Sequence, residues 1–297
     1  MSAAISAGMA RPYGVERVCR VWEVPRSTVY AKRARAAGPP VVLRRRGPAP
    51  RGADADLLVL IRADLAGSPF IGEGHRKVWA RLRVRDYVRV SRTRVLRVMR
   101  ENGLLSPHRA RRGAGAAHEG RIITNAPNEM WGADGVRLET VEDGWVWLFT
   151  AVEHWNAECV GWHVTKKGDR FAALEPVAMG VKNIFGTIEA AAARGLSLRA
   201  DHGTQYVADD FRNQVRYWGI QMSYAFVEEP QTNGVAERFN RTLKEQVIHG
   251  RVFRNVEDLR VAIGAFVKNY NEKWLVEKLG FVSPRRAREL HALRRVA

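Results

Sequence analysis

Short apolar runs separated by turn residues dominate the second half of the chain. The runs at 130–138, 144–152 and 158–164 are rich in aromatic and β-branched side chains, which predicts three consecutive antiparallel strands. Beyond them the pattern predicts, in order, a helix at 171–185, a strand at 197–200, a helix at 210–218, a strand at 220–225 and a helix at 234–249. The second half is therefore expected to be an α/β domain.

The first half has a helical pattern instead. Residues 14–36 predict a helix-turn-helix, because apolar residues recur at helical spacing and Pro25 is acceptable in the first turn of a second helix. That second helix is then a recognition helix, from which we expect Arg26, Ser27 and Lys32 to reach DNA. The alternative is a short basic helical hairpin that only packs.

A second helical region follows at 54–105. Its clearest helix begins at Ser91, a good N-cap, and ends before Gly103. Arg94 and Arg97 lie on a different face from the apolar residues, so we expect them to contact DNA. The alternative is that this charged face is only solvated.

The positive charge is concentrated in the same half. The chain carries 49 Lys and Arg against 31 Asp and Glu, a net charge of +18. Residues 1–121 hold 26 of the basic and 9 of the acidic residues, a net of +17, so residues 122–297 are close to neutral. Codon bias in a high-GC genome can inflate the number of Arg residues, but it would not confine the excess to one half. The basic half therefore indicates a polyanionic partner, and DNA is the expected one.

Two other classes of protein are not indicated. The apolar runs are far shorter than the roughly 20 residues of a membrane span, and the first ten residues lack the features of a signal peptide, so we expect a cytoplasmic protein with no membrane contact. Cys19 and Cys159 stand 140 positions apart without a CxxC motif. They cannot form a disulfide framework or a zinc knot, and two reduced thiols are expected.

These patterns divide the chain into six predicted segments. They are a helix-turn-helix at 1–38, a basic linker at 39–53 that contains Arg44–Arg46, a second helical DNA-binding domain at 54–105, a linker at 106–124, a catalytic core at 125–250 and a C-terminal helical extension at 251–297.

Three acidic residues have the spacing of a two-metal nucleotidyl-transfer site. Asp134 lies in a predicted strand, Asp201 follows another strand, and Glu237 comes after 35 intervening residues near the start of a predicted helix. Two Mg²⁺ ions roughly 4 Å apart can activate an attacking oxygen and stabilise a leaving oxygen, provided that carboxylates hold them. We therefore expect Asp134, Asp201 and Glu237 to be catalytic residues that bind two Mg²⁺ ions, for which Mn²⁺ substitutes.

The residues around these acids resemble a known family. The marks are Pro230-Gln231-Thr232-Asn233-Gly234 before Glu237, Asp201-x-Gly203-x-x-Tyr206, Lys244 seven residues after Glu237, and Tyr270-Asn271 followed by Ser283-Pro284. From about residue 60 to 290 this order is similar to that of OrfB-type transposases of the third insertion-sequence family, which share the catalytic core of retroviral integrases. The resemblance implies a ribonuclease H-like core with a mixed five-stranded sheet, divalent metal, and DNA strand cleavage and transfer through a circular intermediate.

Further residues near Glu237 are candidates for DNA contact. Arg241 and Lys244 fall on the same helical face, at i+4 and i+7, and this face turns apolar at Ile248. An ion pair between Glu237 and Arg241 within the helix is the alternative. Asn233 and the two residues before it form a polar loop, which we expect to contact the strand near the scissile phosphate.

One segment departs from the family. Residues 153–157 read Glu-His-Trp-Asn-Ala, where the family commonly has Asp-x-x-Ser-Arg. Glu153 could replace that Asp, but the loss of Ser-Arg leaves the role of the segment open. We assign no role to His154 or His202, because lone histidines are more often structural.

These observations predict a DNA transposase. Water activated by one metal hydrolyses a phosphodiester at an element end, and the freed 3′-OH attacks a second phosphodiester in line. The expected partners are the terminal inverted repeats of the element, target DNA, further copies of the chain in a homo-oligomer on DNA, and an upstream-frame protein or fusion; the expected place is the nucleoid of a bacterial cytoplasm.

Two alternatives to this function remain. One is a catalytically inactive DNA-binding protein derived from a transposase, which loss of a carboxylate would indicate, although all three are present. The other is a ribonuclease H-like nuclease, against which the two N-terminal binding regions argue.

Overall fold

The computed structural model describes residues 3–38, 52–106, 122–224 and 233–296. The chain forms two compact units, residues 1–50 and 51–297. Most of both predicted basic linkers, including Arg44–Arg46, lies outside the described residues, as do Gln231 and Thr232 of the predicted polar loop.

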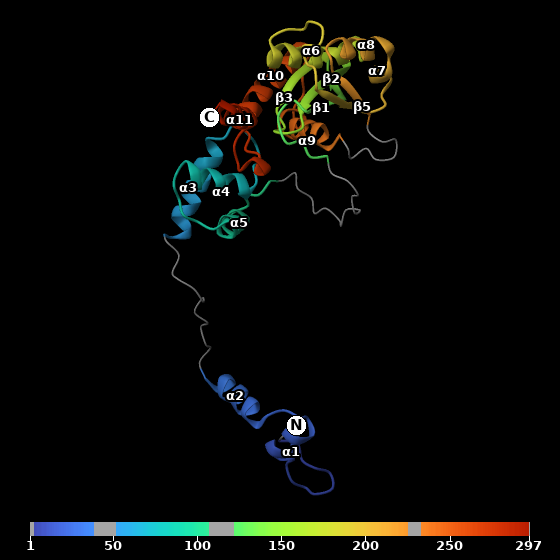
Figure 1. Ribbon diagram of the computed structural model, residues 1–297. Helices are drawn as coiled ribbons and strands as arrows, with labels where there is room; N and C mark the ends of the chain where they lie inside the picture. Colours follow the sequence, from blue (N-terminus) through green and yellow to red (C-terminus); the bar gives the residue numbers. More distant parts are fainter. Residues whose placement is uncertain (1–2, 39–51, 107–121, 225–232, 297) are drawn as a thin grey trace. The chain divides into compact units, whose positions relative to one another are not determined.

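The first unit contains a pair of helices (Figure 1). α1 (Gly14–Val21) and α2 (Arg26–Ala37) are joined by a turn in which Glu23 has a positive φ, which confirms the predicted pair. Among the described residues of this unit, Cys19 is the only one that is buried. The pair therefore has a very small core of its own.

A mixed five-stranded sheet is the centre of the second unit, and it confirms the predicted fold class. The strands are β1 (Met130–Thr140), β2 (Gly144–Glu153), β3 (Cys159–Thr165), β4 (Ser197–Ala200) and β5 (Gln221–Tyr224). Their order is β3-β2-β1-β4-β5. β2 pairs antiparallel with β1 and β3, whereas β4 pairs parallel with β1 and β5, so β1 is the strand at which the direction of pairing changes.

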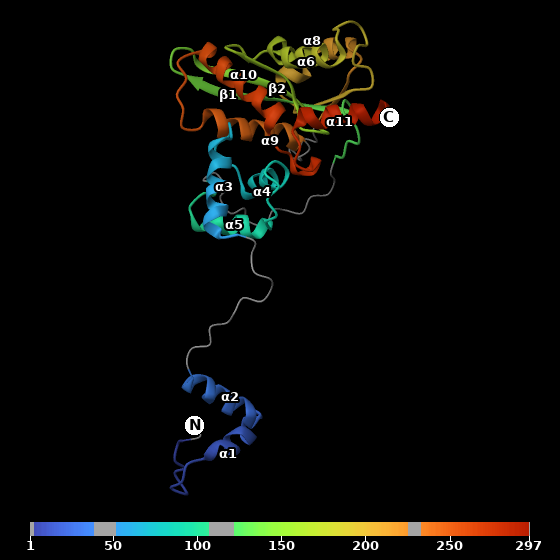
Figure 2. The same cartoon turned by 90° about the vertical axis from the view of Figure 1, so that its left-hand side faces the viewer.

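Helices cover both faces of this sheet (Figures 1 and 2). α6 (Arg170–Phe185), the short α7 (Thr204–Val207) and α8 (Asp209–Tyr217) pack on one face, over a core that includes Trp131, Phe149 and Leu198. α9 (Gly234–Leu243) and α10 (Val256–Lys273) pack on the other face. Side chains alternate between the faces along each strand, so neighbouring residues of β1 enter different cores.

Three more helices precede the sheet and share a core. α3 (Asp54–Ala66), α4 (His75–Val84) and α5 (Arg92–Glu101) bury a common apolar cluster, which consists of Leu57, Ile61, Val78, Leu82, Val95, Val98 and Met99. The carboxylate of Asp64 is also buried, and it accepts hydrogen bonds from Arg81 and Arg85. This region packs on the sheet domain, since the Phe70 ring contacts Phe266 and Trp274.

The C-terminal elements hold the edge strand β3. The side-chain amide of Asn271 bonds both the N–H and the C=O of Cys159, and Arg260 donates to the carbonyl of Val164. After η3 (Glu277–Leu279), α11 (Pro284–Val296) begins at a residue whose carbonyl accepts from the side chain of Asn156. The Tyr270-Asn271 and Ser283-Pro284 pairs therefore lie in segments that brace the sheet.

One predicted helix changes its type in its second half. The long helix expected at 234–249 is α-helical only to Leu243, and a π-helical turn, η2 (Lys244–Ile248), completes it. Within this wider turn Val247 is buried against α10, while the Gln246 side chain bonds the N–H and C=O of Ile71. The α-helical spacing from Glu237 to Ile248 therefore does not hold beyond Lys244.

The six predicted segment boundaries stay predictions. The helices α3 to α5 and the sheet domain belong to one compact unit. Within the described residues, no helix is both long and apolar enough to cross a membrane.

Candidate active site

The three predicted catalytic acids come from three neighbouring elements. Asp134 lies in the middle of β1, Asp201 directly follows β4, and Glu237 is in the first turn of α9. β1 and β4 are adjacent and parallel, so Asp134 and Asp201 lie toward the same end of the sheet. Trp131 and Ala133 point into the α6 core, and Asp134 therefore points to the opposite face, under α9.

The charges of these acids influence one another. Burial raises the pKa of Asp134, and the charge of Asp201 raises it further, whereas Asn240, the Gly135 N–H and Lys244 lower it. Burial also raises the pKa of Glu237, with a further contribution from Asp134, and Arg241 opposes this shift. Asp134 is thus the central member of an anionic cluster.

The acids are neighbours, but they are not gathered around one point. In the part of the chain that the structure describes, no three His, Cys, Asp or Glu side chains lie close enough together to hold one metal ion. The donors themselves suit Mg²⁺, which prefers carboxylate oxygens. The half-buried Asp134 carboxylate also has no ion pair with Lys or Arg among the described residues, so a cation would relieve the cost of its burial.

Asn240 is a residue near the acids whose role the sequence patterns did not reveal. Its Nδ2 donates to Oδ2 of Asp134 at 2.8 Å, and its Oδ1 accepts from the Thr150 hydroxyl at 3.2 Å. Thr150 is the partner of Asp134 across the β1–β2 ladder. Because the amide oxygen of Asn240 accepts a hydrogen bond from Thr150, the amide N–H₂ of Asn240 faces the Asp134 carboxylate. The i+3 spacing of Asn240 from Glu237 was the available signal, since it places both on one side of α9.

Lys244 also faces the acids. It is the first residue of η2, and its ammonium is close enough to Asp134 to lower the pKa of that carboxyl. The Arg241 side chain is exposed, and its charge lowers the pKa of Glu237 in the same way. Both cations therefore lie beside the acids, and their predicted contact with DNA stays a prediction.

Asn233 is placed differently from the predicted exposed loop. It is only 5% exposed, and its Nδ2 donates to the carbonyl of Ala133 at 2.9 Å. A Cβ at Gly132 would lie 2.5 Å from its Oδ1, so the absence of a side chain at position 132 makes room for this amide. Because Asn233 is turned inward, the structure does not support a direct contact with DNA at this residue.

The Glu153 carboxylate is held by hydrogen bonds within the protein. Its buried carboxylate accepts from the Trp131 indole N–H and from the backbone N–H groups of Asn128 and Trp155, and Arg288 approaches it. Burial raises the pKa of this group, while the same N–H donors oppose the shift. Glu153 therefore ties the end of β2 to the start of β1, on the apolar side of the sheet.

Comparison with known proteins finds similar domains and relatives. Residues 124–230 and 218–284 match integrase core domains, and residues 73–112 match an HTH-like domain. The transposase InsD for insertion element IS2A/D/F/H/I/K of Escherichia coli is 28% identical over 292 residues, which covers 93% of this chain and 91% of that protein. The InsD transposase for IS2-9 of Escherichia coli strain K12 is also 28% identical over 292 residues, covering 93% and 90%. The chain is a homologue of the InsD transposases and carries an integrase core.

Solved structures of integrases are similar at lower identity. The simian T-cell lymphotropic virus intasome in complex with PP2A regulatory subunit B56 gamma has a TM-score of 0.46 at 14% identity, over 80% of this chain and 74% of that chain. The HTLV-2 integrase catalytic core domain in complex with magnesium, in its trimeric form, has a TM-score of 0.42 at 14% identity, over 55% and 98%. The integrase core match and the five-stranded sheet together confirm the predicted ribonuclease H-like core.

The HTH-like match falls on the second helical region, where it spans α4 and α5. Both predicted DNA-contact residues of α5 have partners within the protein. Arg94 and Arg97 donate to the carboxylate of Asp54, and Arg97 also pairs with Glu101. These bonds hold the pKa of Asp54 below its usual range, with that from Arg97 the largest cause. The two guanidinium groups therefore join α5 to α3, and their contact with DNA stays a prediction.

The predicted DNA-contact residues of α2 are at its surface. Arg26, Ser27 and Lys32 are all exposed, and Arg26 lies 3.7 Å from a carboxylate oxygen of Glu16. Exposure on a basic helix is what a recognition helix requires, and it suits a solvated hairpin equally well. The role of these three residues stays a prediction.

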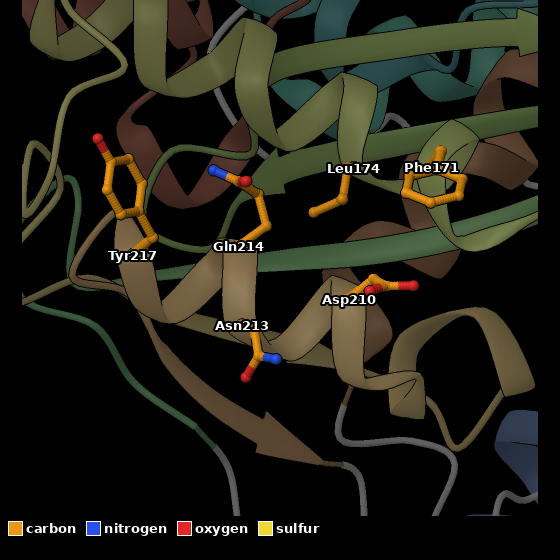
Figure 3. A pocket seen from close by; sticks show the side chains of 6 residues that line it. All are labelled: Phe171, Leu174, Asp210, Asn213, Gln214 and Tyr217. Atoms are coloured by element: carbon orange, nitrogen blue, oxygen red, sulfur yellow. The ribbon is translucent and has the colours of Figure 1, made fainter.

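A surface hollow lies away from the acids, between α6 and α8 (Figure 3). Its lining consists of Phe171, Leu174, Asp210, Asn213, Gln214 and Tyr217. Asp210, in the first turn of α8, forms an ion pair with Arg170. None of the three acids lines this hollow.

Proposed function

We propose that this chain is a DNA transposase that cleaves and joins strands at the ends of an insertion sequence, with Asp134, Asp201 and Glu237 as its catalytic residues. The observation that carries the proposal is the half-buried carboxylate of Asp134 in an integrase core, flanked by Asp201 and Glu237 and faced by Lys244. The relatives named InsD transposase, which the chain matches along nearly its whole length, support the same activity.

Each of these residues has a proposed task. The carboxylates of Asp134, Asp201 and Glu237 would hold two divalent ions, Mg²⁺ or Mn²⁺. When bound, such ions activate a water or 3′-hydroxyl oxygen and stabilise the leaving oxygen of a phosphodiester. Asn240 orients the Asp134 carboxylate, and Lys244 attracts a phosphate next to the scissile bond.

The proposal includes assembly on DNA. Strand transfer joins an element end to a second site, so more than one DNA segment has to be held at once, and a homo-oligomer bound to terminal inverted repeats and target DNA would do this. An upstream-frame partner or fusion is part of the proposal only as a possible supplement to DNA binding. The protein would act in the bacterial cytoplasm, at the nucleoid, where its DNA substrate lies.

The test is a joining assay with labelled ends of the protein's own element and Mg²⁺. We expect joined products from the wild type and none from Asp134→Asn, Asp201→Asn or Glu237→Gln, while all three variants still bind DNA. Asp210→Asn is the matched control, because Asp210 is an exposed acid paired with Arg170. Substantial joining by any of the three acid variants would remove that residue from the site.

The same assay separates the two alternatives. An inactive transposase-derived binding protein would retain end-specific binding and yield no cleaved product with either metal. A ribonuclease H-like nuclease would yield cleaved strands that never become joined. Only joined products support the proposed function.

A further inference from the structure

Two buried polar atoms that have no hydrogen-bond partner among the described residues lie beside one small space under α9. They are Nε2 of His154 and Oδ1 of Asn233, and both side chains belong to residues that are 5% exposed. A Cβ built at Gly132 would meet Oδ1 of Asn233 at 2.5 Å and Nε2 of His154 at 3.1 Å. Both atoms therefore border the space that a side chain at position 132 would fill. Buried polar atoms without a hydrogen bond are unfavourable, and they are rare in folded proteins.

The two atoms are chemically complementary. The hydrogen bond from Nδ2 of Asn233 to the Ala133 carbonyl fixes the orientation of the amide. Oδ1 of Asn233 therefore borders the space, and as an amide oxygen it can only accept a hydrogen bond. Burial, with a smaller contribution from the charges of Lys278 and Arg199, lowers the pKa of His154 to about 4. The imidazole is therefore neutral at pH 7 and carries one N–H, which can reside on Nε2.

Asn233 also determines where α9 begins. It is the residue before the first turn of the helix, and it lies four residues, about one turn, before Glu237. Its amide anchors this end of the helix to β1 by a single hydrogen bond to Ala133. A second anchor at the same amide would restrict the position of Glu237 directly.

Glu237 is the acid for which this restriction matters. It is exposed and is carried by a helix, whereas Asp134 is fixed by the sheet and by Asn240. In the described part of the chain, the three acids do not form a group that could hold one metal ion together. A metal-bound state consequently requires that the beginning of α9 be held in one place relative to β1.

We propose that His154 is a positioning residue, whose Nε2–H donates to Oδ1 of Asn233 and thereby holds the beginning of α9, with Glu237, beside Asp134 in the metal-bound state. The inference rests on the proposed function, because it assumes that these acids bind metal. One hydrogen bond satisfies both partnerless atoms. It also explains why residue 132 is glycine, since a Cβ there would occupy the space in which the two side chains meet.

The experiment compares His154→Leu, which removes the donor, with His154→Gln, whose terminal N–H₂ can replace it. His163→Leu is the control, because His163 is a half-buried histidine of the same sheet on β3. Mn²⁺ binding by the full-length protein is measured by calorimetry, and joining is measured across a range of Mn²⁺ concentrations. Hydrogen exchange of residues 233–243 is followed with and without Mn²⁺.

We expect His154→Leu to bind Mn²⁺ about tenfold more weakly, as expected for the loss of one buried hydrogen bond. The Mn²⁺ concentration for half-maximal joining should rise by the same factor, while DNA affinity and joining at saturating Mn²⁺ stay within about twofold of wild type. Protection of residues 233–243 by Mn²⁺ should be lost in His154→Leu and kept in His154→Gln and His163→Leu. A role limited to packing would lower stability without this dependence on metal and without rescue by Gln.

A crystal structure of the wild type with Mn²⁺ tests the contact even if His154→Leu does not fold. A distance between Nε2 and Oδ1 beyond about 3.2 Å, or a water molecule between the two atoms, would overturn the inference. Wild-type Mn²⁺ affinity in a folded His154→Leu protein would do the same. Failure of the proposed function has a different signature, since Asp134→Asn would then join strands or the wild type would bind no Mn²⁺.

Discussion

The two faces of strand β1 differ in polarity at residues 131–134. Trp131 and Ala133 point into an apolar core under α6, where both are fully buried. Gly132 and Asp134, which alternate with them, face α9 and are surrounded by polar groups from Asn233, Asn240 and His154. At residues 131–134, one face thus packs into an apolar core, while the other carries a charged group that folding alone does not favour.

This difference shows how a buried carboxylate can be kept in a stable domain. The burial of aromatic and aliphatic side chains on the α6 face offsets the cost of desolvating Asp134 on the other. In this part of β1, residues that stabilise the core therefore alternate with residues that line the candidate active site. If this is correct, substitutions on the two faces should change different measured quantities.

The sharpest contrast is between Trp131→Ala and Asp134→Asn. Trp131 is completely buried and bonds Glu153, so its truncation should lower the free energy of unfolding by about 3 to 5 kcal/mol. Asp134→Asn should abolish joining yet leave stability unchanged or higher, because burial disfavours the charged carboxylate. Urea unfolding with EDTA present measures both, and a larger loss of stability from Asp134→Asn than from Trp131→Ala would break the comparison.

The polar face should also make stability depend on pH through His154. Its pKa is depressed in the folded state to about 4 from an ordinary value of 6.5, so the unfolded chain takes up the proton first as pH falls. The stability that this residue contributes is present above pH 6.5 and is lost between about pH 6.5 and 4, by roughly 3 kcal/mol relative to His154→Gln. Unfolding of both proteins is measured at intervals from pH 7.5 to 4, and parallel curves would contradict the shift.

Asn240→Leu should reduce joining by about 10- to 100-fold. The substitution removes a hydrogen bond to a charged group, for which about 1.5 to 3 kcal/mol is typical. Thr242→Val is the matched control, because the Thr242 hydroxyl bonds only to the Arg238 carbonyl of its own helix among the described contacts. Joining rates at fixed Mg²⁺ decide the matter, and equal effects of both variants would assign Asn240 a packing role.

Lys244→Ala should have the smallest effect, about a tenfold reduction in joining, and Lys244→Arg should retain much of the activity. A lost phosphate contact also lowers the slope of log affinity against log salt by about one. Mn²⁺ binding should be unaffected, and Lys268→Ala, an exposed lysine on α10, should change none of these quantities. Calorimetry and DNA titrations at several salt concentrations test this, and an unchanged salt slope would argue against the phosphate contact.

Much of the sheet domain could be predicted because its signals are local. The strands at Met130 and Gly144 begin where runs with aromatic or β-branched residues follow turn residues, and the structure starts these strands and the strand at Ser197 at the predicted positions. The order of the acids along these elements was likewise readable from spacing. Spacing alone did not show that the three acids are not gathered around one point among the described residues, because that depends on how α9 packs on β1.

The remaining features depend on contacts between distant residues. Asn240 and Thr150 are 90 positions apart and meet only in the folded sheet. The π-helical turn at Lys244 is also invisible in the helical pattern, since it accompanies contacts of Gln246 with Ile71 and of Val247 with α10. Asn233 reads as an exposed loop residue until Gly132, on another element, is seen to make room for it.

The bracing of β3 by α10 has a consequence for handling the protein. β3 is an outer strand of the sheet, and an unprotected outer strand can pair with the same strand of another molecule. Asn271 and Arg260 occupy backbone groups of β3 that such pairing would use. A truncated core that ends near residue 250 would leave these backbone groups without partners. Such a fragment should therefore aggregate on expression under conditions in which the longer protein does not.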